Sequence, residues 1–355
     1  MVKTFKPTED NFKILGRTET IDDILYINYS CSGIEFEFTG SRLDMTLCSN
    51  CNSYEDIHKA CVAVLINDLE VPHKRFVLNS KEDRYTLFES EKIQKVKVKF
   101  IKMSEAAFAK VGIKNIHIYD FKELKKAEYS KRKIEFIGDS ITCGYGNEGK
   151  LNVDGFNTAQ ENPWLNYASK TARNLNSDYN LVSWSGIGII SSYTEEDEAN
   201  TELLMPELYK YTDMDLDKTL GKTKNQFELW DNSKFVPNLI VINLGTNDFS
   251  FTKDIKERIK CFEKGYFKFL KQVREANPSS TILCILGVMG DDLYPAVKKC
   301  VTCFSREFHD NNIYSMHLNP QSESDGIGTD SHPSLVTHEK LSIMLTKKIK
   351  EIMNW

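Results

Sequence analysis

The second part of the chain alternates apolar runs with longer amphipathic segments, and this alternation limits the possible folds most strongly. The apolar runs have the length and composition of strands and cover residues 134–140, 179–185, 239–245, 281–288 and 313–318. Helix-like segments lie near residues 162–176, 253–276, 291–309 and 334–353. Strands that alternate with helices form a parallel sheet with helices on both faces. The sequence therefore predicts a three-layer α/β/α domain over residues 133–355.

The first 122 residues follow a different pattern. Short alternating or β-rich runs, such as residues 24–29, 33–38 and 61–66, are separated by turn-forming residues. This pattern is typical of an all-β sandwich, and we expect a jelly-roll-like domain over residues 1–122. Residues 122–133 are charged and poor in strand formers, which predicts a linker between the two domains.

The bulk properties exclude several classes of function. A hydrophobic fraction of 41% with 27% charged residues is ordinary for a soluble globular protein, and 355 residues suffice for two domains. The net charge of −5 leaves no basic surface for nucleic acid. The longest apolar stretch, residues 282–289, is too short to span a membrane.

The N-terminal residues and the cysteines predict a cytoplasmic protein. Residues 1–17 mix lysines and acids without the apolar region of a secretory signal. The nine cysteines have no disulfide-framework spacing, so we expect reduced thiols. Two Cys-x-x-Cys pairs, Cys48/Cys51 and Cys300/Cys303, fall in different predicted domains, which favours buried thiols over a metal site.

Reactive residue types follow the strands. Ser140 ends the run Ile-Glu-Phe-Ile-Gly-Asp-Ser, at the strand end where open α/β sheets place their reactive groups, which makes it a candidate nucleophile. Gly186 ends the next strand and can offer its backbone N–H to a ligand. Asn247, in Gly-Thr-Asn-Asp, can add a side-chain donor for an oxyanion, and Asp248 can hold the loop.

A base for the serine is available near the C-terminus. His332, in Asp-Ser-His-Pro, precedes the last helical segment, and Asp330 can orient its ring. His338 is the rival, although the helical pattern from Ser334 predicts a surface position for it. Each of these turns alone would be an ordinary loop. The four together, each supplying a different required part, predict a serine hydrolase site.

The order Gly-Asp-Ser, Gly, Gly-x-Asn-Asp, Asp-x-His-Pro resembles the SGNH (GDSL-type) hydrolases. The Ser-Gly-Ile-Gly-Ile and Asp-Ser-His-Pro details, with a β-sandwich in front, make essentially the whole chain similar to carbohydrate esterase family two, whose members remove acetyl groups from plant polysaccharides. The resemblance implies Ser140 as nucleophile and His332 as base. It also implies an oxyanion hole formed by the N–H groups of Ser140 and Gly186 and the amide of Asn247, and no cofactor or metal.

The chain departs from the pattern in two places. Broader SGNH enzymes place an acid three residues before the histidine, where this chain has Thr329, so either Asp330 or a backbone carbonyl orients His332. Ser331 stands where some relatives carry an aromatic residue that stacks on sugar, which leaves the glycan preference open. In the long insertion 191–237 we expect most aromatic residues to pack inward and Tyr193 to line the substrate cleft.

The expected function is removal of O-acetyl groups from hemicellulose-type oligosaccharides, xylan or mannan. A short-chain lipase or thioesterase would use the same four turns but needs an apolar acyl channel, for which the insertion is too polar. A non-catalytic glycan-binding protein is the alternative from a different class. The Gly-x-Gly-x-x-Gly run at residues 144–149 matches a dinucleotide fingerprint. It lacks the following helix and the acid at the end of the next strand, so we reject a nicotinamide site.

Overall fold

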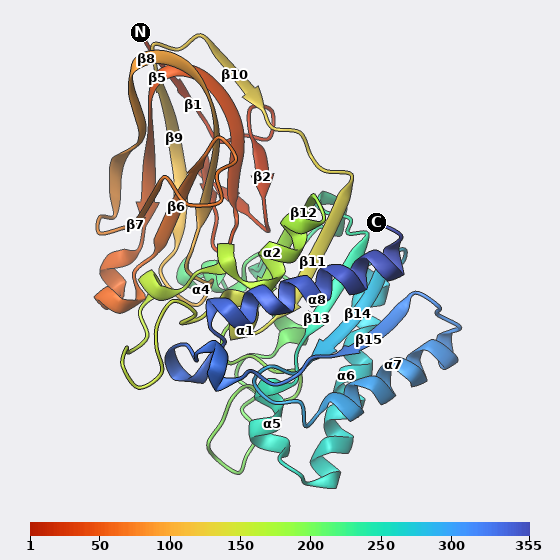
Figure 1. Ribbon diagram of the computed structural model, residues 1–355. Coiled ribbons are helices and arrows are strands. Elements are labelled where there is room, and N and C mark those ends of the chain that lie inside the picture. Colours follow the sequence, from red (N-terminus) through yellow and green to blue (C-terminus); the bar gives the residue numbers. More distant parts are fainter.

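The computed structural model describes residues 1–355 and has an antiparallel β domain followed by an α/β domain (Figure 1). The first domain is one network of ten strands in the order β3-β4-β9-β5-β8-β6-β7, in which β1 pairs with β9 and both β2 and β10 pair with β5. Its strands are β1 (Val2–Phe5), β2 (Lys13–Leu15), β3 (Glu19–Ile21), β4 (Ile24–Tyr26), β5 (Gly33–Ser49), β6 (Cys61–Ile66), β7 (Lys74–Val77), β8 (Glu82–Lys102), β9 (Val111–Tyr119) and β10 (Glu123–Lys126).

Two long strands organise this domain. The 17-residue β5 and the 21-residue β8 pair with each other along almost their whole length. The register of the pair shifts between Gly40 and Arg42, and a bulge of this kind bends a strand. The bend lets β5 pair with β2 and β10 before the bulge and with β9 after it.

The predicted linker is shorter than expected. Residues 123–126 form β10, which pairs with residues 36–39 of β5, so the first sheet extends beyond residue 122. The next strand, β11, already begins at Arg132. Only Leu124 of β10 is apolar, and this charged edge strand carries too little hydrophobic pattern to be recognised in the sequence.

The second domain has the predicted parallel sheet, in the strand order β12-β11-β13-β14-β15. The strands are β11 (Arg132–Gly138), β12 (Ser177–Ser183), β13 (Leu239–Asn243), β14 (Thr281–Leu286) and β15 (Ile313–His317). The helices are α1 (Ser140–Cys143), α2 (Tyr167–Asn174), α3 (Met205–Leu208), α4 (Met214–Thr219), α5 (Thr246–Thr252), α6 (Lys256–Ala276), α7 (Tyr294–Phe308) and α8 (Leu335–Met353).

Both faces of the parallel sheet are buried, as its apolar strands require. Ile240 and Ile242 of β13 belong to the core that α6 and α7 cover, whereas Leu239 and Val241 face the core under α2 and α8. Successive side chains of a strand point to opposite faces, so the continuous apolar runs fill both layers. This arrangement confirms the predicted α/β/α domain.

One hydrophobic cluster contains residues of both domains. Cys61, Ala63 and Leu65 of β6 pack in the same cluster as α2 and α8. The interface also contains Arg17, whose fully buried guanidinium lies 3.4 Å from Glu135 of β11 and donates to the carbonyls of the insertion. This shared burial means that residues of the β domain can reach the interior of the α/β domain.

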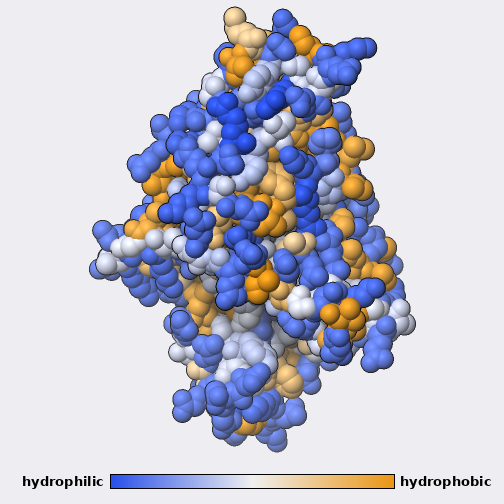
Figure 2. All heavy atoms as spheres, turned by 90° about the vertical axis from the view of Figure 1, so that its left-hand side faces the viewer, coloured by the Kyte–Doolittle hydropathy of each residue, from blue (hydrophilic) through white to orange (hydrophobic).

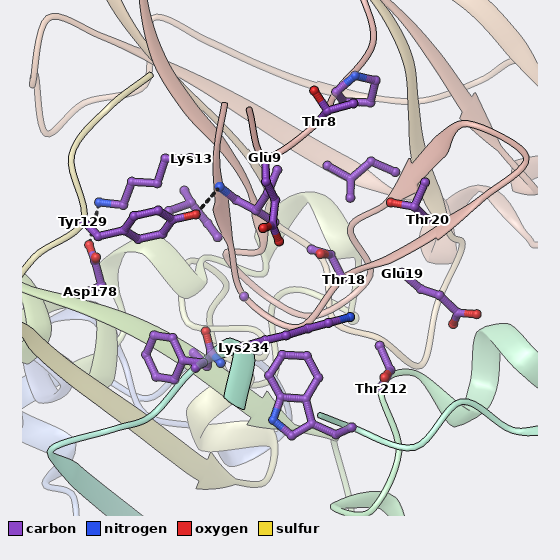
Figure 3. Close-up of a pocket in the computed structure, with 18 of the residues that line it drawn as sticks. Thr8, Glu9, Lys13, Thr18, Glu19, Thr20, Tyr129, Asp178, Thr212 and Lys234 are labelled. Carbon is purple, nitrogen blue, oxygen red and sulfur yellow. Dashed lines mark hydrogen bonds and ion pairs between the residues drawn. The ribbon is translucent and has the colours of Figure 1, made fainter. Parts of the chain in front are cut away.

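A cavity of about 470 Å³ lies between the domains (Figure 3). Its wall includes the ion pair of Lys13 with Asp178, 2.6 Å apart, and Tyr129 of the connecting segment. Lys133 and Asp178 mark the amino-terminal ends of β11 and β12. The cavity is therefore at the edge of the sheet opposite to Ser140 and is separate from the predicted catalytic residues.

Most of the surface in view in Figure 2 is hydrophilic, and the thiols agree with the sequence analysis only in part. Hydrophilic residues cover most of the face shown in Figure 2, with hydrophobic residues in small groups between them. None of the helices combines the length and the apolar character that crossing a bilayer requires. All nine cysteines are free thiols, and Cys51 and Cys300 are buried, but Cys303 is exposed.

Candidate active site

Ser140 is the first residue of the short helix α1, directly after β11. Asp139 caps this helix, because its carboxylate accepts a hydrogen bond of 3.0 Å from the backbone N–H of Ile141. Gly144 closes the turn in the left-handed conformation, with φ 78°. The strand and the cap fix the backbone of Ser140, and its side chain is buried at the carboxyl edge of the sheet.

His332 lies next to Ser140, although 192 residues separate them in sequence. The Nε2 atom of His332 is 2.8 Å from the Oγ atom of Ser140. Its Nδ1 atom faces two backbone carbonyls, of Asp330 at 3.0 Å and Thr329 at 3.2 Å. Because both partners of Nδ1 are acceptors, Nδ1 carries the proton and Nε2 is free to accept from the serine hydroxyl. Burial lowers the pKa of His332 and favours this neutral form.

Asp330 orients the histidine differently from the predicted acid of a triad. Its backbone carbonyl contacts the ring, whereas its carboxylate accepts a hydrogen bond of 3.0 Å from the hydroxyl of Tyr145. Asp330 has a left-handed φ of 51°, which turns its carbonyl toward the ring and its side chain away. Of the two possibilities that the sequence left open, the structure has the backbone carbonyl.

Tyr145 is a site residue that the sequence analysis missed. Its ring lies 4.4 Å from the His332 ring and 3.9 Å from Phe156, on which it stacks. With its hydroxyl on Asp330, Tyr145 braces the turn that carries the histidine. The only signal in the sequence was its place in the glycine-rich run after the nucleophile.

We expect Asp330→Asn to lower kcat by no more than about tenfold, because the carbonyl that holds Nδ1 remains and Tyr145 can still donate to an amide oxygen. Loss of the carboxylate in a true triad lowers kcat about 10⁴-fold. Steady-state kinetics with 4-nitrophenyl acetate distinguish the two cases, with thermal unfolding as the control for folding. A loss in kcat above about 10³-fold in a folded Asp330→Asn variant would show that the Asp330 carboxylate takes part in catalysis.

The glycines of residues 144–149 let the turn after Ser140 pack closely against the turn that carries His332. A Cβ atom on Gly146 would lie 2.8 Å from the Cβ atom of Thr329, and one on Gly149 would lie 2.0 Å from its Oγ1 atom. The backbone N–H of Thr329 donates to the carbonyl of Gly146 at 3.0 Å. These glycines therefore allow the histidine turn to pack directly on the nucleophile turn.

The predicted oxyanion donors are Ser140 itself and residues that follow β12 and β13, the two strands paired with β11. The backbone N–H groups of Ser140 and Gly186 have no hydrogen-bond partner within the protein, and Gly186 has the positive φ of 77° that glycine tolerates. Asn247, buried in α5, donates through Nδ2 to the carbonyl of Ile187 at 2.9 Å and to the carboxylate of Asp139 at 3.4 Å. The amide of Asn247 is thus fixed between the nucleophile turn and the Gly186 loop.

Asp248 holds a loop, as expected, but the loop is the one after Gly186 rather than its own. Its carboxylate is fully buried and accepts hydrogen bonds of 2.7–3.2 Å from the N–H groups of Ile189, Ile190 and Ser191. Burial raises the pKa of Asp248 to about 6, although these N–H groups oppose the shift. By accepting several backbone hydrogen bonds, the Asp248 carboxylate fixes the conformation of the loop after Gly186.

Tyr193 is at the surface beside this loop, with 55% of its area exposed. Its N–H donates to the carbonyl of Gly186 at 2.8 Å, so its position is linked to the oxyanion hole. Tyr209, Tyr211 and Trp230 of the same insertion are buried, as expected for residues that pack it onto the sheet.

His338 does not have the predicted surface position. It is fully buried between α8 and α2, where its Nδ1 atom accepts a hydrogen bond of 3.1 Å from the N–H of Tyr167. Burial lowers the pKa of His338 to about 3, which keeps the ring neutral. The surface position was predicted because His338 is polar, but it lies on the face of α8 that packs against α2. His338 makes no hydrogen bond to Ser140.

Two family models match the chain. The GDSL-like lipase/acylhydrolase model matches residues 136–306, and the carbohydrate esterase 2 N-terminal model matches residues 14–127. Among solved structures, a family two carbohydrate esterase from Clostridium thermocellum in complex with cellohexaose is 30% identical. The alignment covers 97% of this chain and 99% of that chain, with a TM-score of 0.85.

Two curated relatives are also similar. The acetylxylan esterase/glucomannan deacetylase of Cellvibrio japonicus is 27% identical over 99% of this chain and 92% of that protein. The cellulase/esterase CelE of Acetivibrio thermocellus is 36% identical over 72% of this chain, and the match spans only 30% of that protein.

The parallel sheet and the serine–histidine pair at its carboxyl edge, together with the first family model, define a GDSL-like acylhydrolase. The β domain that precedes the α/β domain and the near-complete alignment with a solved family two carbohydrate esterase identify the family within this class. The chain belongs to carbohydrate esterase family two, which confirms the resemblance drawn from the sequence.

Proposed function

We propose that the protein is a serine esterase that removes O-acetyl groups from hemicellulose-type oligosaccharides through an acyl-enzyme on Ser140. The observation that carries the proposal is the 2.8 Å contact of His332 Nε2 with Ser140 Oγ, with Nδ1 of the same ring on backbone carbonyls. A base held in the right tautomer beside a hydroxyl is the arrangement that activates serine.

In the first half-reaction, Ser140 Oγ attacks the acetyl carbonyl carbon and its proton passes to His332 Nε2. The oxyanion is stabilised by the N–H groups of Ser140 and Gly186, and by the amide of Asn247 when its 3.4 Å hydrogen bond to Asp139 is exchanged for one to the oxyanion. The tetrahedral intermediate collapses to the acyl-enzyme, and His332 gives the proton to the departing sugar oxygen, which leaves as a hydroxyl group. Water then attacks the acyl carbonyl, with His332 as base again, and acetate leaves as the Ser140 hydroxyl is restored.

The functions of the relatives support the choice of substrate. The Cellvibrio japonicus relative is named an acetylxylan esterase and glucomannan deacetylase, and the Clostridium thermocellum structure contains cellohexaose. On this chain, Tyr193 offers an exposed aromatic ring beside Gly186 on which a sugar ring can stack.

A chain-length series of 4-nitrophenyl esters, with acetylated xylan and mannan oligosaccharides analysed by mass spectrometry, tests the proposal. We expect the highest kcat/KM for acetate and loss of acetyl groups from at least one of the two glycans. A preference for acyl chains of eight carbons or more would favour a lipase or thioesterase. Glycan binding without any ester hydrolysis would favour a binding protein.

A further inference from the structure

Glu105 belongs to the β domain, yet its carboxylate lies against Ser185, in the loop of the α/β domain that contains Gly186. It follows β8 in sequence and is fully buried. One carboxylate oxygen accepts a hydrogen bond of 2.5 Å from the hydroxyl of Ser185, and the other accepts one of 2.7 Å from the backbone N–H of Ser185. Ser185 directly precedes Gly186, whose N–H is a proposed oxyanion donor.

The backbone of Glu105 is fixed from two sides. The buried ammonium of Lys102 donates to the carbonyl of Glu105 at 2.8 Å. The N–H of Glu105 donates to the buried carboxylate of Glu161 at 3.2 Å. Because all three side chains are buried, Glu105 has little freedom to move, and Ser185 is held in a fixed place.

The same carboxylate also contacts the helix of the nucleophile. The thiol of Cys143 in α1 lies 3.5 Å from Glu105 and 3.3 Å from the hydroxyl of Ser183, the last residue of β12. The helix α1 begins at Ser140, which supplies the other backbone donor. Glu105 therefore touches both segments that carry the backbone N–H groups of the oxyanion hole.

We infer that Glu105 is a positioning residue that sets the separation of the Ser140 and Gly186 N–H groups, so that the β domain forms a structural part of the catalytic centre. This inference rests on the proposed esterase function. Backbone donors stabilise an oxyanion only when they point at the place where the charge develops. A displaced Ser185 would move the N–H of Gly186 away from that place.

The contacts require hydrogen-bonding atoms in the right places rather than a charge. A glutamine at this position could accept from the Ser185 N–H through its oxygen and donate to the Ser185 hydroxyl through its nitrogen. Aspartate keeps the charge but is one methylene shorter and would not reach. The pair Glu105→Gln and Glu105→Asp therefore separates geometry from charge.

The experiment compares Glu105→Ala, Glu105→Asp and Glu105→Gln in the full chain with 4-nitrophenyl acetate. We expect the Ala and Asp variants to lose about 10- to 100-fold in kcat, less than the 10²–10³-fold of a deleted donor, with KM within about threefold. The Gln variant should stay within about threefold of wild type. Affinity for methylboronic acid, which forms a tetrahedral adduct with the serine, should fall in proportion to kcat/KM.

Asp44→Asn is the matched control. Asp44 is also a buried acid of the β domain, bound to Arg42 at 2.8 Å and to Tyr119 at 3.0 Å, both within that domain. We expect this variant to lower the unfolding temperature and to leave kcat unchanged. A folded Glu105→Ala variant with wild-type kcat, or with a raised KM alone, would overturn the inference.

If the Ala and Asp variants do not fold, Ser185→Ala tests the same link from the other domain, with an expected loss in kcat of about three- to tenfold at unchanged KM. An unchanged kcat in Ser185→Ala would then overturn the inference. Failure of wild type to hydrolyse the ester would instead overturn the proposed function, and the inference with it.

Discussion

Ser140→Ala is expected to lower kcat by at least about 10⁴-fold, because without Oγ no acyl-enzyme forms and only binding and the oxyanion hole remain. The fold should persist, since Asp139 rather than Ser140 caps α1 and the Oγ atom bonds only His332. The measurement is steady-state hydrolysis of 4-nitrophenyl acetate, with mass spectrometry of the wild-type acyl-enzyme.

The control for Ser140→Ala is Ser324→Ala, an exposed serine that contacts Ser322 and lies outside the site. Both variants should unfold at the wild-type temperature. Retention of more than about a tenth of the wild-type kcat by Ser140→Ala would exclude this serine as the nucleophile.

His332→Ala is expected to lower kcat by about 10⁴-fold or more, because the serine then lacks its base. Burial lowers the pKa of His332, and only the neutral ring can accept the serine proton. The kcat/KM of wild type should therefore rise with pH through a pKa below 6.5 and stay level above it. The variant should lose this rise.

His317→Ala is a matched control for His332. His317 at the end of β15 also has a polar partner and a tyrosine neighbour: its Nε2 lies 2.6 Å from the carboxylate of Asp291, and its ring lies 4.8 Å from that of Tyr294. It is a half-exposed histidine at the same edge of the sheet without a serine partner. We expect it to keep wild-type activity and the wild-type pH profile. An equal loss in both variants would mean that the effect is not specific to the base.

The α/β domain could be predicted because its strands are buried on both faces. Such strands need continuous apolar residues, so β11–β15 stand out against the amphipathic helices. Edge strands carry less of this signal. The charged β10, which pairs with β5 on one side, was therefore assigned to a linker.

The main site residues could be located for a related reason. The carboxyl ends of parallel strands meet at one edge of a sheet, so Ser140, Gly186 and Asn247 had to lie near one another. Their residue types then indicated a serine hydrolase. The side-chain direction of Asp330 could not be predicted in this way, because it depends on the backbone conformation of one residue with φ 51°.

Local patterns in the sequence were enough to predict the succession of strands and helices, the residue types at the carboxyl edge of the sheet and the family. The contacts between distant segments could be seen only in the folded structure. The carbonyl rather than the carboxylate of Asp330 faces His332, His338 is buried against α2, and Glu105 reaches Ser185 from the other domain. Such contacts follow from how the elements pack. The sequence around a polar residue does not show which distant residue will become its partner.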